Sequence, residues 1–281
     1  MLEFRVATDP GSPDKPNEDA FAILPTLAVV ADGATSPPHL GDGCIHGPAW
    51  YAQTLVGFVA AAHLSRPAAE PADLLAEAIE RTTQAHSGSC DVGHPGSPSA
   101  TVAMVTMSPD GILRWLVLGD CTFVADAGPD LLVVSDDRLS NTSHAERAAV
   151  KEPGAASDPV EYARRIDALV LAQRAHRNRP GGFWVASTDP QAGCESLAGS
   201  VAADTVGRRG ALFTDGASRI VDLYGIHSWS TALKVLDSAG SSELLRQLRI
   251  AETRDQVANS FPRVKVRDDA TALAGHWGKD V

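Results

Sequence analysis

The chain has 281 residues, of which 44% are hydrophobic, so it is long enough to bury a full core in one large domain or two small ones. Its formal net charge is −11, which argues against binding to nucleic acid through general electrostatic attraction. The sequence contains no run of about 18 apolar residues, and Met1–Arg5 lacks the pattern of a secretory signal, so we expect a cytoplasmic protein without membrane partners.

The N-terminal part of the chain predicts a pair of strands followed by two helices. Residues 21–31 form two apolar runs that Pro25 interrupts, and the second run ends at the Asp-Gly pair 32–33. Residues 49–64 and 72–86 have helical length, and the second segment places its apolar residues on one face. A strand that ends in Asp-Gly would present a carboxylate at its C-terminal end.

Short apolar runs separated by turn residues dominate the next part of the chain. We expect them to form an antiparallel meander of four strands, at residues 100–107, 112–118, 122–125 and 131–134. Residues 138–180 are charged and rich in alanine, with helical periodicity over 160–175. The remainder predicts strands at 183–186, 211–214 and 270–273 and helices at 228–238 and 242–254.

The order of these elements favours one fold class. Strands occur in groups, with helices before, between and after them, which indicates an α+β fold with an antiparallel sheet core flanked by helices. The sequence shows neither an internal repeat nor a long biased linker, so residues 1–281 are expected to form a single domain.

Aspartates follow several of the predicted buried strands. Asp32 follows LAVVA, Asp120 follows LVLG and Asp215 follows ALFT, although Asp is a poor strand former. The acidic clusters 17–19 and 268–269 lie next to other apolar runs. Each Asp-Gly pair alone is equally well explained as a turn, but together these carboxylates would share one pocket.

Close carboxylates raise one another's pKa unless cations neutralise them. Oxygen ligands without Cys or His favour two Mg²⁺ or Mn²⁺ ions over zinc or copper. Such a pair would activate a water and hold phosphate oxygens for in-line displacement, so the pattern predicts phosphoester hydrolysis.

Six motifs in order resemble those of the protein phosphatase 2C (PPM) family, in its bacterial form. They are NEDA at 17–20, VVADGA at 29–34, SATVAMV at 99–105, LGDCT at 118–122, LFTDGASR at 212–219 and RDDATAL at 267–273. The resemblance implies a four-layer αββα sandwich with two metal ions in a cleft at one end. It further implies a serine/threonine phosphatase acting on phosphorylated proteins, which we expect to be a monomer.

The resemblance assigns roles to particular residues. It implies that Asp19 holds one metal, that Asp32 bridges both metals, that the Gly33 carbonyl completes the second site, and that Asp215 and Asp268 close the first. Glu18, Asp120 and Asp269 are expected to lie behind these ligands and support them, Asp269 by orienting a metal-bound water. Residues 138–180 would form the variable flap beside the cleft, where a basic cluster would either bind acidic substrate segments or form a solvated helix face.

Two departures from the family pattern concern phosphate binding and proton transfer. The family usually has an Arg four to six residues before its first aspartate, and here only Lys15 is available to bind phosphate. No His follows Asp32-Gly33. His39 and His46 are nearby candidates for a general acid, but packing or solvent exposure is the commoner role of such histidines.

The four cysteines show no CxxC spacing, which argues against a zinc knuckle or a disulfide framework. Cys121 is expected to be a small core residue, and Cys44-Ile45-His46 leaves metal or redox sensitivity open. Three alternatives to a protein phosphatase also stay open. They are a phosphatase of a small metabolite, a catalytically silent scaffold and a fold that binds one cation for stability alone.

Overall fold

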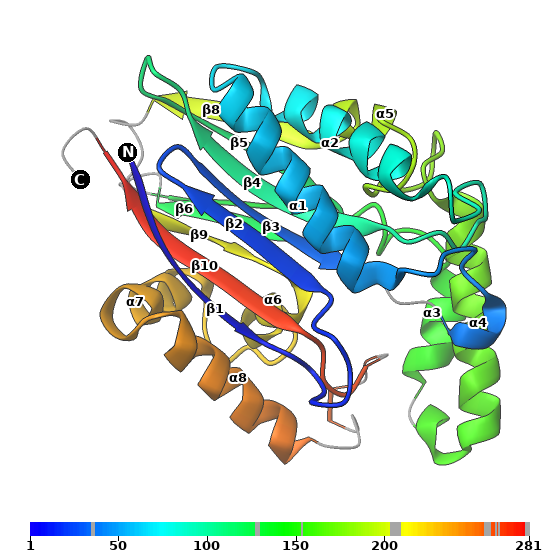
Figure 1. Ribbon diagram of the computed structural model, residues 1–281. Coiled ribbons are helices and arrows are strands. Elements are labelled where there is room, and N and C mark those ends of the chain that lie inside the picture. The colour runs from blue at the N-terminus through cyan, green and yellow to red at the C-terminus, as the bar shows by residue number, and fades with distance from the viewer. Residues whose placement is uncertain are drawn as a thin grey trace.

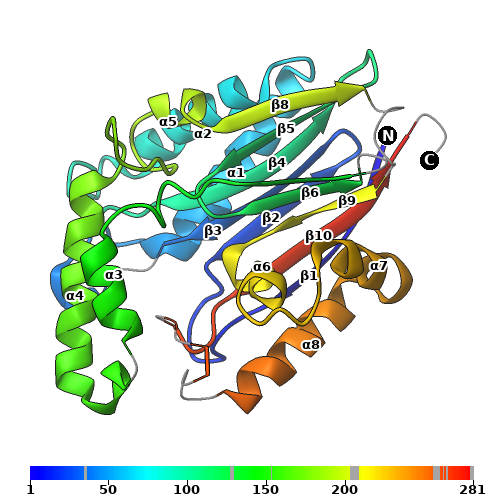
Figure 2. The ribbon, with the colours of Figure 1, turned by 180° about the vertical axis from the view of Figure 1, so that it is seen from behind.

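The computed structural model describes residues 1–34, 37–126, 130–152, 154–202, 209–255, 260–261, 263 and 265–278. Within these residues, two five-stranded antiparallel sheets pack face to face, and helices cover both outer faces (Figures 1 and 2). The predicted αββα sandwich is therefore confirmed.

The first sheet carries the longest buried strands. Its strand order is β2 (Asp19–Leu24), β3 (Leu27–Gly33), β4 (Ala100–Met107), β5 (Ile112–Leu118) and β8 (Leu197–Ala202). Helices α1 (Gly47–Ser65) and α2 (Pro71–His86) lie over its outer face, and the short helix α5 (Gln191–Cys194) packs against α2 (Figure 1). The two predicted long helices and the strand pair before them are confirmed.

The second sheet brings the two ends of the chain together. Its strand order is β1 (Leu2–Asp9), β10 (Ala270–Trp277), β9 (Arg209–Phe213), β6 (Thr122–Asp126) and β7 (Leu131–Ser135). Its outer face is covered by α6 (Asp215–Asp222), α7 (Trp229–Ala239) and α8 (Ser241–Arg254) (Figure 2).

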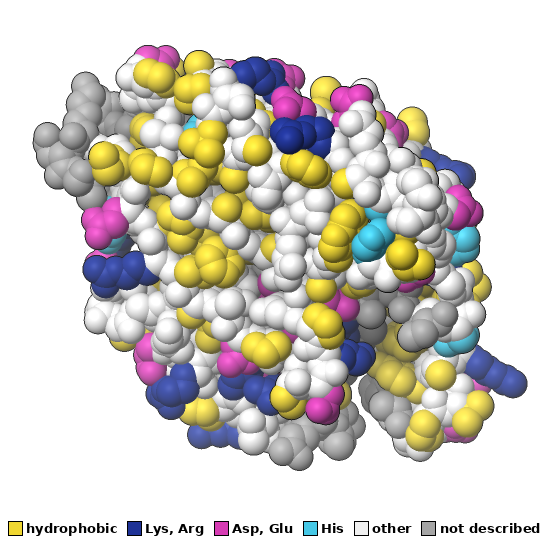
Figure 3. All heavy atoms as spheres, viewed as in Figure 1, with side chains coloured by type: hydrophobic (Ala, Val, Ile, Leu, Met, Phe, Trp, Pro, Cys, Tyr) yellow, Lys and Arg dark blue, Asp and Glu magenta, His cyan; other side chains and the backbone are white. Residues whose placement is uncertain are grey.

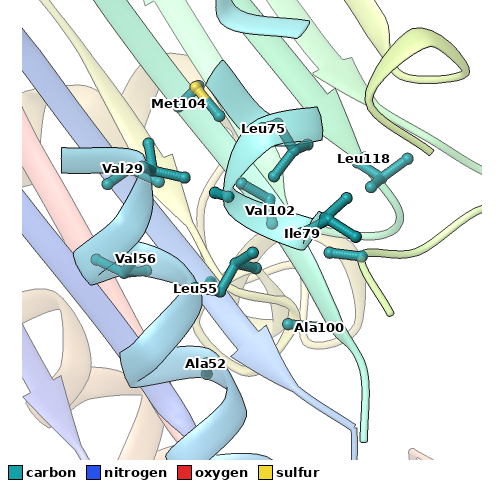
Figure 4. Packing of buried hydrophobic residues seen from close by; sticks show 14 of the residues in the cluster. Val29, Ala52, Leu55, Val56, Leu75, Ile79, Ala100, Val102, Met104 and Leu118 are labelled. Atoms are coloured by element: carbon teal, nitrogen blue, oxygen red, sulfur yellow. The ribbon is translucent and has the colours of Figure 1, made fainter. Parts of the chain in front are cut away.

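Strand β3 shows why the central strands are apolar on both faces. Alternate residues of a strand point to opposite sides of the sheet. Val29 packs with α1 and α2, and Figure 4 shows it in one cluster with Leu55 of α1 and Ile79 of α2. Its neighbour Val30 packs between the two sheets with Phe123 and residues from β9 and β10. Because both sides are buried, the sequence of the strand is a continuous run of apolar residues from Leu27 to Ala31.

A pair of helices stands at one end of the sandwich. Helix α3 (His144–Lys151), the 3-10 turn Ala155–Ser157 and helix α4 (Pro159–His176) form this lobe, which we call the flap (Figure 1). Asp158 caps α4 by accepting hydrogen bonds from the amides of Val160 and Glu161. The predicted helix at 160–175 is confirmed.

The predicted four-stranded meander is wrong at its centre. Strand β5 belongs to the first sheet and β6 to the second, so the chain changes sheets at Gly119. Gly119 has a φ of 76°, and a Cβ there would lie 2.4 Å from a side-chain carbon of Thr101. A short turn that seems to join neighbouring strands can therefore also pass between stacked sheets, because the hydrophobic pattern is the same in both cases.

The predicted strand at 183–186 is also wrong, because this segment makes only isolated bridges, at Phe183 and Ala186. Four further elements, β1, β8, α3 and α6, were not predicted from the sequence. Among the described residues, no helix is long and apolar enough to cross a membrane.

Candidate active site

Four strand ends place aspartates at the end of the sandwich beside the flap. Asp19 begins β2 and lies opposite Asp32, the next-to-last residue of β3, in the antiparallel register. Asp215 begins α6 directly after β9, and Asp268 lies two residues before β10. Strands β9 and β10 are also antiparallel neighbours, so both sheets deliver carboxylates to the same end.

Thr214 connects the two sheets at this point. Its hydroxyl donates a 2.9 Å hydrogen bond to Oδ2 of Asp19, and its oxygen accepts the backbone N–H of Thr271 at 3.0 Å. Asp19 is only 6% exposed, and its other oxygen, Oδ1, accepts no hydrogen bond from any residue that the structure describes. A buried carboxylate oxygen without a donor is costly unless a cation or water satisfies it.

Backbone contacts fix the loops that carry these aspartates. The N–H of Gly33 donates to the carbonyl of Glu18 at 3.0 Å, and a Cβ at Gly33 would lie 2.9 Å from that same oxygen. Asp269 accepts backbone hydrogen bonds from Gly11 and Glu18, each at 2.7 Å. Asp269 therefore holds the segment that leads into Asp19, a role different from the water-orienting one expected from the sequence.

A cavity of about 410 Å³ lies between the aspartates and the flap. One wall contains the site residues Asp32, Gly33, Asp120, Asp215 and Asp268. The other wall is contributed by the flap and its flanks, with Leu139, Arg147, Ile166, Leu169, Arg174 and Arg177. Figure 3 shows a notch between the flap lobe and the body of the molecule on one face. The cavity thus has one anionic wall, formed by the aspartates, and one wall with cationic and apolar side chains, formed by the flap and its flanks.

The surroundings of the carboxylates in this anionic wall, and of Asp19 next to it, disfavour the charged form. Burial, helped by repulsion from Asp215, raises the pKa of Asp19 to about 7, against the hydrogen bonds from Thr271 and Thr214. Burial and then Asp215 likewise raise the pKa of Asp120 to about 7. The pKa of Asp32 is raised well above its usual value by burial and by repulsion from Asp215 and Asp19.

Two cations at the site were not assigned from the sequence. Lys265 Nζ donates to Asp268 Oδ1 at 2.6 Å, and Arg219 donates to Asp268 Oδ2 at 2.7 Å. Burial alone would lower the pKa of Lys265, but attraction from Asp268 and Asp32 outweighs it and raises that pKa. Arg219 could have been anticipated, because it lies four residues after Asp215, one turn further along a helix.

The remaining predicted residues lie outside this cavity. Lys15 is exposed in the loop before β2 and does not line the cavity. His39 pairs with Asp167 of α4 at 2.8 Å, and His46 contacts the thiols of Cys44 and Cys90. Cys121 is fully buried against the hydroxyl of Thr101, as expected for a small core residue.

The predicted basic cluster of the flap divides into two groups. Arg165 pairs with Glu152 and Glu161, and Arg164 also pairs with Glu161, so these two form a charged helix face. Arg177 instead lines the cavity and donates to the carbonyl of Ser97 at 2.9 Å, and Arg174 also lines it.

Comparison with known proteins agrees with this geometry. The family model of protein phosphatase 2C matches residues 12–249, which is most of the chain. The chain belongs to the protein phosphatase 2C family. A search of curated proteins found no match. The family resemblance predicted from the six sequence motifs is therefore confirmed.

Solved structures of bacterial serine/threonine phosphatases share the fold of this protein phosphatase 2C member. MsPP from Mycobacterium smegmatis, solved with cacodylate, has 16% identity over 98% of both chains and a TM-score of 0.54. Stp1 from Staphylococcus aureus has 16% identity over 99% of this chain and 96% of that chain, with a TM-score of 0.53. The catalytic domain of PstP, solved with 2 manganese ions, has 15% identity over 98% and 97% and a TM-score of 0.52. At these identities, the likeness establishes the fold.

The residues of this phosphatase family member fit a pair of hard divalent cations. Asp19, Asp32, Asp215 and Asp268 offer only oxygen ligands, which Mg²⁺ and Mn²⁺ prefer. The free Oδ1 of Asp19 and the raised pKa values of Asp19 and Asp32 both indicate missing positive charge. The cations Lys265 and Arg219 neutralise mainly Asp268, so they leave the rest of the cluster uncompensated.

These carboxylates predict how the stability of the metal-free protein depends on pH. Because Asp19 and Asp120 have a folded-state pKa of about 7, the folded chain binds more protons than the unfolded chain from about pH 4 up to about pH 7. Stability should therefore fall as the pH rises through 7. We expect the melting temperature of chelated protein to drop by roughly 5–10 °C between about pH 5.5 and pH 8.

Differential scanning calorimetry in a chelating buffer measures this effect. Adding Mn²⁺ should restore more stability at pH 8 than at pH 5.5, since cations compete with protons for the same oxygens. Asp120→Asn provides the matched comparison, because it removes one of the titrating groups and should flatten the pH profile. A melting temperature of the chelated protein that rises with pH would contradict the prediction.

Proposed function

We propose that this protein is a metal-dependent phosphatase that hydrolyses phosphoserine and phosphothreonine on protein substrates, using two Mn²⁺ or Mg²⁺ ions. The observation that carries the proposal is the meeting of Asp19, Asp32, Asp215 and Asp268, from both sheets, beside one cavity. Membership of the protein phosphatase 2C family supports the same chemistry. The manganese-bound structure of PstP supports the choice of metal.

The carboxylates of Asp19, Asp32, Asp215 and Asp268, with the carbonyl of Gly33, would hold the two ions. Bound divalent ions lower the pKa of a water so that it can act as a nucleophile near neutral pH, and they neutralise phosphate oxygens. Thr214 orients Asp19 through its hydrogen bond to Oδ2. The hydrogen bond from Gly33 to the carbonyl of Glu18 fixes the C-terminal end of β3, where Gly33 lines the cavity.

The walls of the cavity would bind and shield the substrate. Leu169, Phe183 and Val185 are buried apolar residues that line it, so they would keep water away from part of the reacting phosphate. Arg177 and Lys265 add positive charge on two sides of the same space. A phosphate monoester carries about two negative charges, which this combination of cations and metal ions would neutralise.

Lys265 is better placed than Lys15 to bind the substrate phosphate. Lys265 lines the cavity beside Asp268, whereas Lys15 is exposed and outside it. At saturating Mn²⁺, we expect Lys265→Met to raise the KM for a phosphothreonine peptide roughly 10-fold or more, as loss of a charged hydrogen bond would. Lys15→Met is the matched control and should leave KM nearly unchanged. Steady-state kinetics of both variants would refute this assignment if Lys15→Met had the larger effect.

The function itself is tested with metal-stripped protein assayed on a phosphothreonine peptide and on p-nitrophenyl phosphate, with and without millimolar Mn²⁺. The proposal predicts turnover only with metal, and faster hydrolysis of the peptide. Turnover of the small ester but not of the peptide would instead indicate a phosphatase of a small metabolite. Thermal stabilisation by Mn²⁺ without any turnover would indicate a structural cation site or a silent scaffold, and the phosphatase proposal would be wrong.

A further inference from the structure

A second group of metal-binding side chains lies outside the aspartate site. Cys44 and His46 precede α1, His86 is the last residue of α2, and Cys90 follows four residues later. The four possible ligand atoms all lie within 4.8 Å of one another. Figure 1 shows the first turn of α1 and the last turn of α2 at the same end of the molecule, beside α4.

The distances in this group are close to those of a tetrahedral site. The sulfur of Cys44 lies 3.6 Å from Nδ1 of His46 and 3.5 Å from Nδ1 of His86. The sulfur of Cys90 lies 3.3 Å from Nδ1 of His46 and 3.2 Å from the sulfur of Cys44. With Zn–S of about 2.3 Å and Zn–N of about 2.0 Å, tetrahedral ligands are about 3.3–3.8 Å apart. The three sulfur-to-nitrogen distances fall in this range, whereas the two sulfurs are closer together than they would be around zinc and would separate on binding it.

The sulfur atoms are not in a disulfide. Their separation of 3.2 Å is well above the roughly 2.05 Å of an S–S bond, and both cysteines are free. Backbone amides instead point at the thiols: the N–H of His46 donates to Cys44 at 3.4 Å, and Ile45 supplies a backbone hydrogen bond to Cys90. Such donors stabilise negative charge on sulfur, which is the form that binds metal.

Aromatic side chains hold the two imidazoles in place. Trp50 stacks on His46 with ring centroids 4.2 Å apart, and it also contacts His86 at 5.3 Å. Tyr51 meets His86 edge-on at 6.3 Å and is itself anchored by a hydrogen bond to the carbonyl of Ser187. His86 is 1% exposed, so its ring cannot turn freely into solvent. The ligand atoms are therefore preorganised on an apolar support.

We propose that Cys44, His46, His86 and Cys90 form a structural zinc site. Two thiolates and two imidazoles in a tetrahedral arrangement are the ligand set that zinc prefers, and their two negative charges balance the charge of Zn²⁺. Four protein ligands leave no open position, so the site would stabilise structure and would not activate water. The proposal does not depend on the phosphatase function.

The position of the site indicates what it would stabilise. Cys44 lies at the end of the segment that follows Asp32-Gly33, and Gly43 accepts a backbone hydrogen bond from Asp91 at 2.8 Å. The same segment contacts helix α4 of the flap: Arg174 donates to the carbonyl of Gly41 at 2.8 Å, and His39 pairs with Asp167. Zinc would join α1, α2 and the base on which α4 rests.

Metal analysis of the full-length protein, purified under reducing conditions without chelators, tests the proposal. Inductively coupled plasma mass spectrometry should find about one zinc per chain in the wild type and in Asp32→Asn, which lacks a ligand of the other site. Cys90→Ser should lose the zinc. Cys194→Ser, which changes an exposed cysteine outside the group, is the matched control and should keep it.

Cobalt provides a readout that does not rely on the variants folding. When chelated wild-type protein is reloaded with Co²⁺, the proposed site should give a thiolate-to-cobalt charge-transfer band and strong tetrahedral visible bands. The aspartate site has only oxygen ligands and gives no thiolate band. Two results would overturn the proposal: wild-type protein that takes up neither zinc nor thiolate-bound cobalt, or freshly purified protein in which Cys44 and Cys90 are joined in a disulfide.

Discussion

Replacing Asp32 with asparagine should lower Mn²⁺-dependent phosphatase activity by about three orders of magnitude or more, because the change removes the carboxylate that would contact both metal ions. Asparagine keeps the size of the side chain but removes its charge. Asp32 lies opposite Asp19 in the strand register and lines the cavity. Activity is measured on the phosphothreonine peptide over a range of Mn²⁺ concentrations.

The same variant should make the metal-free protein more stable at pH 8. Asp32 has a strongly raised pKa because it is buried and repelled by Asp215 and Asp19, so its charge is unfavourable in the folded state without metal. Opposite effects on activity and stability would distinguish a lost metal ligand from a misfolded protein. Asp73→Asn, which changes an exposed carboxylate in the first turn of α2, should alter neither property much. Full activity in Asp32→Asn would refute the site assignment.

Replacing Gly216 with alanine is expected to damage the site by moving it. A Cβ at Gly216 would lie 1.9 Å from the backbone oxygen of Asp269 and 3.2 Å from Cβ of Asp268. The first turn of α6 and the loop before β10 would have to separate, which would pull Asp215 away from Asp268. We expect a loss of about 2–3 kcal/mol in stability and at least a roughly 10-fold weaker apparent affinity for Mn²⁺.

Gly57→Ala is the matched control for this change. Gly57 lies within α1, and nothing is within 4 Å of the position of an added Cβ. Alanine in a helix interior should stabilise the protein by roughly 0.5–1 kcal/mol and leave Mn²⁺ binding unchanged. Urea unfolding and Mn²⁺ titration followed by activity measure both effects. Equal behaviour of the two variants would show that the contact between α6 and residues 268–269 does not position the site.

The sequence was sufficient to place the aspartates of the candidate site at the ends of buried strands. Asp32 and Asp215 each follow an apolar strand, and a poor strand former at such a place can be recognised in the sequence alone. The fold class followed from grouped strands and long helices. The crossing between sheets at Gly119 was not predictable, because adjacent antiparallel strands and strands in stacked sheets have the same local pattern.

The cationic side of the site and the cysteine-histidine group depend on contacts between distant segments. Lys265 is one of many charged residues in the sequence, and only the path of the chain before β10 brings it to Asp268. Cys44-x-His46 and His86-x-x-x-Cys90 are each short and unremarkable pairs, 40 residues apart as counted from His46 to His86. They meet because α1 and α2 pack as antiparallel neighbours, which returns the chain to the same end of the sheet.

The hydrogen bond from Thr214 to Asp19 crosses between the two sheets. The proposed metal ligands are divided in the same way, with Asp19 and Asp32 on one sheet and Asp215 and Asp268 next to strands of the other. Ions held between these ligands would cross-link the two sheets at the end of the sandwich beside the flap. Loss of the metal ions would then allow one sheet to move relative to the other. Amide hydrogen exchange should therefore become faster in β3 and in β9 together, although these strands are far apart along the chain.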